Sequence, residues 1–217
     1  MKNVLFDFDG TLMDTWLGIK STIEATLRAM EVPFEEKTIT QALVGVSLVR
    51  VFEKLLGSDS SKAAQAAQKY REFFPESGMP RSIPFEGAAR MLEELQSRGR
   101  TLFLVTARNE NITRLMLKEH DLAGSFAWVR GERESEVLDG KAHMVAEVLE
   151  RFALDPGDCV MVGDRYYDIE AARNNGVATI GVTYGYGTDE ELMEAGAIQL
   201  AGSIEELREI LVNDDGL

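Results

Sequence analysis

Residues 1–15 read MKNVLFDFDGTLMDT, and two aspartates, Asp7 and Asp9, interrupt an apolar run that otherwise predicts a buried strand. Carboxylates are rarely placed in such a strand without a partner. Because side chains alternate along a strand, we expect Asp7 and Asp9 to project on the same side at its end. A hairpin turn at Asp9-Gly10 would need a second strand directly afterwards, but a helical pattern follows. The stretch therefore predicts a strand that brings two acids to one edge of a sheet.

The composition predicts a globular protein with a substantial core. The chain has 217 residues, of which 45% are hydrophobic and 28% charged, and this length fits one core domain with an inserted subdomain. The net charge of −14 argues against nucleic acid or an anionic membrane as the main partner. No apolar run approaches the length of a membrane span and no signal peptide is recognisable, so we expect a cytoplasmic protein. The sequence does not predict whether it is a monomer or a dimer.

The single cysteine, Cys159, excludes a disulfide within the chain. It lies in an apolar run, DCVMVGD, that predicts a strand. We therefore expect Cys159 to be a small core residue and not a nucleophile.

Short apolar runs alternate with amphipathic helical patterns over most of the chain. The predicted strands are residues 2–8, 101–106, 126–130, 159–164 and 177–184, with 197–200 as a sixth candidate. Glycines at the ends of the helical stretches fit left-handed helix caps. This alternation predicts an α/β fold, a Rossmann-like parallel sheet covered by helices on both faces.

Residues 15–81 break this alternation. They contain three successive helical patterns and no convincing strand. We therefore expect a core domain formed by residues 1–14 and 82–217, with residues 15–81 inserted as a helical domain.

Two more acids, Asp164 and Asp168, lie in VMVGDRYYDIEAARNNG, where another predicted strand ends. The carboxyl ends of parallel strands gather at one edge of a sheet, so Asp7, Asp9 and Asp164 are expected to converge there. Such a cluster of oxygens is tolerable around a cation, and a hard one such as Mg²⁺ suits carboxylates. Asp168, considered alone, is equally well explained as a helix N-cap.

Four segments in this order resemble phosphatases of the haloacid dehalogenase superfamily, in the phosphoglycolate phosphatase-like group. They are FDFDGTLMDT, VTAR at residues 105–108, Lys141, and GDRYYDIEAARNNG, each after the expected strand or before the expected helix. The resemblance covers essentially the whole chain, and it implies that residues 15–81 form a helical cap. It implies a Mg²⁺-dependent phosphatase that acts on a small phosphorylated metabolite, phosphoglycolate-like or nucleotide-like.

The resemblance also implies roles for individual acids. Asp7 would be the nucleophile that forms an aspartyl-phosphate, and Asp9 the general acid/base. Mg²⁺ would be held by the Asp7 carboxylate, the Asp9 carbonyl and Asp164. Asp168 would hold a metal-bound water or orient Lys141.

The phosphoryl group is expected to contact Gly10, Thr106, Ala107, Arg108 and Lys141. The Thr106 hydroxyl and adjoining backbone N–H groups would hold its oxygens, although alone Thr106 is better explained as a strand-to-helix cap. Arg108 is equally compatible with an anionic substrate group and with a surface charge. Lys141 starts a helix, where the dipole disfavours a cation; in the family this lysine pairs with the nucleophile and the phosphoryl group.

Other functions remain open from the sequence. A phosphomutase of the same superfamily would use the same nucleophile and metal, but would return the phosphoryl group to a bound sugar phosphate. A dehalogenase is disfavoured because halide displacement needs no Mg²⁺ cluster. A phospho-acceptor or interaction module without turnover is the alternative from a different class, and the helical insertion together with Asp9 argues against it.

Overall fold

The computed structural model describes residues 1–133 and 140–213, which form two compact units. One unit comprises Met1–Met13 and Pro84–Leu217, and the other Asp14–Ile83. Strands β2 (Met13–Asp14) and β3 (Ile83–Pro84) pair with each other where the chain passes from one unit to the other. The predicted boundaries, after residues 14 and 81, lie next to these limits. That the smaller unit acts as a cap stays a prediction.

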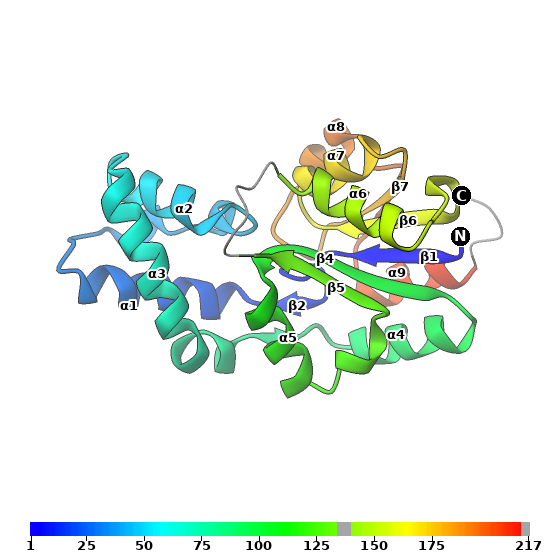
Figure 1. Ribbon diagram of the computed structural model, residues 1–217, viewed down its shortest axis with the longest axis horizontal. Helices are drawn as coiled ribbons and strands as arrows, with labels where there is room; N and C mark the ends of the chain where they lie inside the picture. Colours follow the sequence, from blue (N-terminus) through cyan, green and yellow to red (C-terminus); the bar gives the residue numbers. More distant parts are fainter. Residues whose placement is uncertain (134–139, 214–217) are drawn as a thin grey trace. The chain divides into compact units, whose positions relative to one another are not determined.

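The larger unit is built on a six-stranded sheet with the order β5-β4-β1-β6-β7-β8 (Figure 1). All pairings are parallel, so the predicted sheet is confirmed, including its sixth strand. The strands are β1 (Asn3–Phe6), β4 (Thr101–Asn109), β5 (Trp128–Glu132), β6 (Cys159–Gly163), β7 (Ala178–Val182) and β8 (Gln199–Ala201). In register, Phe6 lies opposite Leu104 on one side and Val162 on the other. The three strands that precede the predicted site segments are therefore neighbours.

Helices cover both faces of this sheet, as predicted (Figure 1). One face carries α6 (Ala142–Arg151), α7 (Tyr166–Arg173) and α8 (Asp189–Ala195). The other carries α4 (Ala88–Ser97), α5 (Glu110–Glu119) and α9 (Ile204–Val212), and short 3₁₀ turns occur at Ala123–Ser125 and Pro156–Asp158. Within the described ranges, no helix combines the length and the apolar character needed to cross a bilayer.

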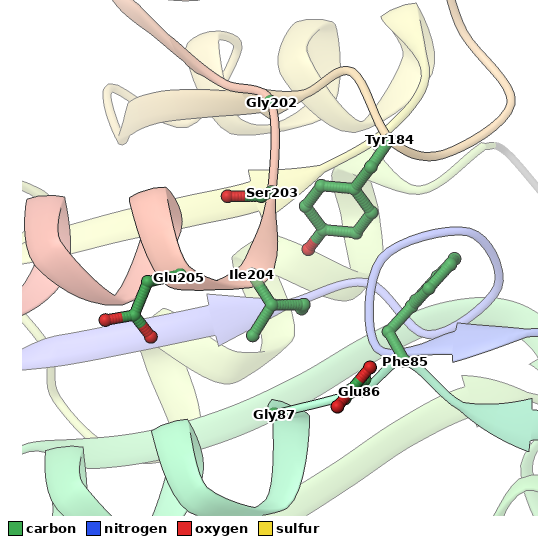
Figure 2. Close-up of a pocket in the computed structure, with 8 residues that line it drawn as sticks. All are labelled: Phe85, Glu86, Gly87, Tyr184, Gly202, Ser203, Ile204 and Glu205. Atoms are coloured by element: carbon green, nitrogen blue, oxygen red, sulfur yellow. The ribbon is translucent and has the colours of Figure 1, made fainter.

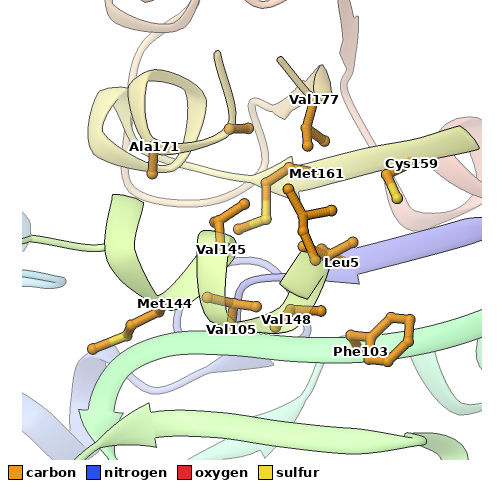
Figure 3. Packing of buried hydrophobic residues seen from close by; sticks show 12 residues of the cluster. Leu5, Phe103, Val105, Met144, Val145, Val148, Cys159, Met161, Ala171 and Val177 are labelled. Carbon is orange, nitrogen blue, oxygen red and sulfur yellow. The ribbon is translucent and has the colours of Figure 1, made fainter. Parts of the chain in front are cut away.

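The core under α6 and α7 follows directly from strand periodicity (Figure 3). Every second residue of the central strands faces these helices: Leu5 on β1, Phe103 and Val105 on β4, Cys159 and Met161 on β6. Val145 and Val148, one turn apart on α6, pack against them. Cys159 is fully buried in this cluster, where the sequence places it. The packing fixes the strand ends, from which the site residues emerge.

The smaller unit is helical, as its sequence pattern predicts. It contains α1 (Trp16–Ala29), α2 (Leu48–Leu55) and α3 (Ser60–Ser77), with 3₁₀ turns at Glu36–Thr38, Gln41–Leu43 and Met79–Arg81. Three aromatic rings line up between α2 and α3: Phe52 meets Tyr70 at 6.2 Å, and Tyr70 meets Phe74 at 5.7 Å between centroids. Fully buried alanines on α3, Ala63 and Ala66 among them, leave room for neighbouring helices to approach.

Candidate active site

The loop after β1 is a tight turn that places Asp7 and Asp9. The Asp7 N–H donates to the Val162 carbonyl at 2.9 Å, which extends the ladder between β1 and β6 by one bond. The Gly10 N–H donates to the Met13 carbonyl at 2.8 Å and closes the turn. Gly10 has φ +81°, and a Cβ at this position would lie 2.2 Å from Oδ2 of Asp164. Only glycine satisfies both the backbone conformation and the contact.

A buried lysine links two of the predicted acids. Nζ of Lys141 donates to Oδ1 of Asp7 and to Oδ1 of Asp168. Oδ2 of Asp168 accepts the backbone N–H of Arg165 at 3.0 Å, so this carboxylate both starts α7 and orients the lysine. The interpretation of Asp168 as the N-cap is wrong, because the N-cap of α7 is Arg165 and Asp168 lies three residues later, where its side chain accepts the N-cap N–H. Asp168 also contacts Lys141, and its functional role stays a prediction.

The carboxylates of Asp7, Asp164 and Asp168 form one buried group. Their oxygens lie within 4.8 Å of one another, and the three residues are 5%, 1% and 0% exposed. Three carboxylates with one lysine leave a negative excess in a largely buried region. A cluster of this kind is unfavourable unless a cation or protons neutralise it.

Burial dominates the electrostatics of this group. It raises the pKa of Asp7 to about 7, because the opposing attraction of Lys141 only partly offsets the loss of hydration and the repulsion from Asp168 and Asp9. Burial likewise raises the pKa of Asp164, and Asp168 and Asp7 raise it further. Burial alone would lower the pKa of Lys141, but Asp168 and Asp7 outweigh it and raise that pKa above its usual value. Lys141 therefore contributes a positive charge to the site at neutral pH.

The residues present fit a hard divalent cation. Oδ1 of Asp164 is buried and has no hydrogen-bond partner among the residues that the structure describes, whereas its Oδ2 accepts the Tyr186 N–H at 2.8 Å. An unpartnered buried carboxylate oxygen beside two other carboxylates is a donor set that Mg²⁺ prefers. Asp7 and Asp164 lie together in this group, and their role as metal ligands stays a prediction. Asp168, for which the sequence predicted an indirect role, belongs to the group as well, whereas the Asp9 side chain turns elsewhere.

The segment after β7 packs closely against Asp164, and this contact was not predicted from the sequence. A Cβ on Gly185 would lie 2.4 Å from Cβ of Asp164, and one on Gly187 would lie 2.1 Å from its carbonyl oxygen. Both glycines are therefore needed for the close approach that lets Tyr186 donate to Asp164. The pattern GYG at residues 185–187 was the available signal, since it stands just beyond a predicted strand.

Thr106, Ala107 and Arg108 lie at the end of β4, next to β1. The pairing of β4 with β5 is irregular between Val105 and Asn109, which is typical of a bulge that redirects side chains. Oγ1 of Thr106 accepts the Arg108 N–H at 3.1 Å, so the Thr106 hydroxyl keeps its proton for another acceptor. Because the Arg108 N–H is engaged in this bond, it is not available to hold a phosphoryl oxygen in this arrangement.

Arg108 and Asp9 form an ion pair that the sequence did not predict. Nη2 of Arg108 lies 2.7 Å from Oδ1 of Asp9, and Nε lies 3.0 and 2.9 Å from the two carboxylate oxygens. The side chains are only 8% and 9% exposed. The interpretation of Arg108 as a solvated surface charge is therefore wrong.

A hollow of about 480 Å³ lies beside the loop that follows β1 (Figure 2). Phe85, Tyr184, Ile204 and Glu205 are among the residues that line it, and none of the predicted site residues does. The Tyr184 hydroxyl donates to the Thr11 carbonyl at 2.8 Å. Tyr184 thus both lines this hollow and contacts the loop that carries Asp7 and Asp9.

Comparison with known proteins gives a consistent result. The model of the family described as haloacid dehalogenase-like hydrolase matches residues 4–182. A 5'-nucleotidase of Pseudomonas aeruginosa is 30% identical over 209 residues, which cover 96% of this chain and 95% of that protein. A phosphoglycolate phosphatase of Vibrio parahaemolyticus is 27% identical over 219 residues, covering 97% and 96%. The crystal structure of a predicted phosphatase from Clostridium acetobutylicum matches with a TM-score of 0.90 at 30% identity, covering 97% of this chain and 98% of that one.

Proposed function

The chain belongs to the haloacid dehalogenase-like hydrolases and is a phosphatase of that family, and from this premise we propose that it hydrolyses a small phosphate monoester through an aspartyl-phosphate on Asp7, with Mg²⁺ as cofactor. One observation carries the proposal. Asp7 is a buried carboxylate bonded to Lys141, and the uncommitted Oδ1 of Asp164 lies in the same group of oxygens. Such a group can bring a negative nucleophile and a negative phosphoryl group together.

The first half of the reaction forms the covalent intermediate. A carboxylate oxygen of Asp7 attacks phosphorus, and the bond from phosphorus to the ester oxygen breaks. The ester oxygen keeps the electron pair and takes a proton from Asp9, so that an alcohol leaves. Lys141 stays protonated throughout because its pKa is raised, and it offsets charge on Asp7 and on the phosphoryl oxygens.

The second half regenerates the enzyme. A water molecule attacks phosphorus and gives its proton to Asp9, while the bond from phosphorus to Asp7 breaks. Inorganic phosphate leaves and Asp7 is again a carboxylate. The oxygen of the Thr106 hydroxyl already accepts a bond from the Arg108 N–H, so the hydroxyl donates to a phosphoryl oxygen in both halves. The backbones of Ala107 and Gly10 line the proposed phosphoryl-binding site.

Asp7, Asp164 and Asp168 would hold the Mg²⁺ ion, together with the Asp9 carbonyl. When bound, the ion supplies Lewis-acid charge neutralisation between the nucleophile and the phosphoryl group. The backbone contribution of Asp9 fits the turn after β1. Burial and mutual repulsion raise the pKa values of Asp7 and Asp164, and this unfavourable negative charge supports the proposal of a cation there.

The substrate class is proposed as a small, diffusible phosphorylated metabolite in the cytoplasm. The relatives named above act, by their names, on nucleotides and on phosphoglycolate, and this chain shares their length. We propose that the helical unit, as a cap, selects among such esters.

Phosphate release from a panel of esters tests the proposal. The panel contains phosphoglycolate, nucleoside monophosphates, sugar phosphates, pyrophosphate and pyridoxal phosphate, each with Mg²⁺ and with EDTA. We expect many turnovers on at least one member, dependent on Mg²⁺ and abolished by Asp7→Asn. Labelling that stops at one phosphoryl group per chain would instead identify a phospho-acceptor module. Transfer to a sugar phosphate without phosphate release would identify a mutase.

A further inference from the structure

The ion pair between Arg108 and Asp9 conflicts with the role proposed for Asp9. Both carboxylate oxygens accept N–H bonds from the guanidinium, at 2.7, 2.9 and 3.0 Å. Acid/base catalysis requires one of these oxygens to face first the ester oxygen and then the attacking water. An Asp9 that acts as the acid/base is therefore expected to leave this ion pair.

The backbone of Arg108 is fixed, so the release must come from its side chain. The Arg108 N–H is bonded to Oγ1 of Thr106 at 3.1 Å. On the other side, a Cβ on Gly131 would lie 2.7 Å from the Arg108 carbonyl oxygen, so β5 packs directly against this backbone. The guanidinium, in contrast, is joined to this anchor by a long chain of rotatable bonds. It can change its partner while its backbone stays in place.

The competing partner is the phosphoryl group itself. A guanidinium binds carboxylate and phosphate oxygens with the same fork geometry, and a phosphoryl dianion carries more charge than a carboxylate. Arg108 is rooted two residues from Thr106, the residue proposed to hold the phosphoryl oxygens. The backbone of Arg108 is therefore close to the proposed phosphoryl-binding residue, and its guanidinium reaches Asp9.

We propose that Arg108 exchanges partners during the catalytic cycle. In the substrate-free enzyme it holds Asp9. When a phosphate ester binds, the guanidinium moves to a phosphoryl oxygen, and the freed Asp9 carboxylate takes up a proton from solvent and gives it to the leaving ester oxygen. Substrate binding thus releases the acid/base. This inference rests on the proposed function, because it takes Asp9 as the acid/base and Thr106 as a phosphoryl-binding residue.

Exchange predicts a specific coupling in phosphate binding. Removing the Asp9 carboxylate also removes the competitor for Arg108, so Asp9→Asn should bind inorganic phosphate about tenfold more tightly than the wild type. Loss of a negative charge would tighten phosphate binding even without exchange. The two explanations differ in the Arg108→Gln background, where no guanidinium is left to be released.

The experiment is a double-mutant cycle measured by isothermal titration calorimetry with inorganic phosphate in Mg²⁺ buffer. The four proteins are the wild type, Asp9→Asn, Arg108→Gln and the double variant, with Arg98→Gln, an exposed arginine on the same unit, as the matched control. We expect Asp9→Asn to tighten binding about tenfold in the wild type and less than about threefold in Arg108→Gln. Arg98→Gln should match the wild type. Equal tightening in both backgrounds would overturn the exchange.

A second measurement needs no folded Arg108→Gln protein. The arginine Nε–H resonance of Arg108, identified by its loss in Arg108→Lys, should shift when phosphate is added to the wild type. In Asp9→Asn it should differ from the wild type before phosphate is added. A resonance that phosphate leaves unmoved would overturn the exchange.

Turnover assays distinguish a failure of the exchange from a failure of the proposed function. Suppose that the wild type hydrolyses p-nitrophenyl phosphate, that Asp7→Asn abolishes this hydrolysis, and that the double-mutant cycle shows no coupling between Asp9 and Arg108. These results together would refute the exchange and leave the proposed function intact. A coupled cycle in a protein that releases no phosphate from any ester supports the exchange and refutes the proposed function.

Discussion

Replacing the nucleophile should make the metal-free protein more stable. Burial raises the pKa of Asp7 from 3.8 to about 7. An acid whose pKa is raised in the folded state contributes most to the stability of that state when the pH is below its unfolded pKa. This stabilisation is lost as the pH rises through the folded pKa. At pH 8 the ionised Asp7 carboxylate therefore costs the folded state about 4 kcal/mol relative to a neutral group, at about 1.4 kcal/mol per pKa unit.

Asparagine mimics the neutral carboxyl group at every pH and keeps an oxygen for Lys141. In EDTA at pH 8 we expect Asp7→Asn to raise the free energy of unfolding by about 2–4 kcal/mol, or the Tm by on the order of 10 °C. At pH 5 the gain should fall by more than half, because Asp7 is then mostly protonated in the folded protein.

Thermal unfolding followed by circular dichroism, at several pH values and with and without Mg²⁺, measures this effect. Asp121→Asn is the matched control, since Asp121 is exposed and the same charge is removed. With millimolar Mg²⁺ the order should reverse, because the wild type gains binding energy that the variant lacks. If Asp7→Asn were no more stable than the wild type in EDTA at pH 8, the reasoning about buried, uncompensated charge would be refuted.

Four further outcomes are expected. Chelation should abolish phosphate release and Mg²⁺ should restore it, whereas Ca²⁺ should restore little because its larger and more flexible coordination misplaces Asp7. Full activity after exhaustive chelation would contradict the metal role of Asp164. In rapid-quench kinetics with p-nitrophenyl phosphate, Asp9→Asn should give a burst of about one nitrophenol per enzyme, followed by steady-state turnover about 10²–10⁴-fold slower than that of the wild type. The absence of a burst, with an equal loss of rate on alkyl esters, would contradict the role of Asp9 as the acid/base. Gly10→Ala should weaken Mg²⁺ binding at least tenfold by calorimetry, because its Cβ would displace Asp164; unchanged affinity would show that the turn adapts. Cys159 should resist a thiol reagent at pH 8 until the protein unfolds, since burial raises its pKa to about 11; rapid labelling of the folded protein would contradict its place in the core.

The parallel sheet and the meeting of Asp7 with Asp164 could be predicted because they depend on local patterns. Runs such as residues 101–106 alternate with amphipathic helices, and parallel topology then brings the strand ends together without further information. The burial of Asp7 and its contact with Lys141 agree with the roles that the resemblance implied, although those roles stay predictions.

The partner of Asp9 could not be predicted in this way. Asp9 and Arg108 are 99 residues apart in the chain, and the irregularity in β4 that directs Arg108 leaves no periodic trace in the sequence. The close packing around Asp164 had only a weak signal in the sequence. Gly185 and Gly187 stand just beyond a predicted strand, but the sequence does not indicate which residue their missing side chains make room for.

The central position of β1 has a consequence for hydrogen exchange. Its backbone is bonded on both edges, to β4 and to β6, whereas β5 and β8 lie at the borders of the sheet. Amides on such a strand exchange with solvent only through the largest openings of a domain, while border strands open at lower cost. Asp7 directly follows β1, and its own N–H continues that ladder. The proposed nucleophile thus directly follows an interior strand, and its position should persist through the smaller fluctuations that open the border strands.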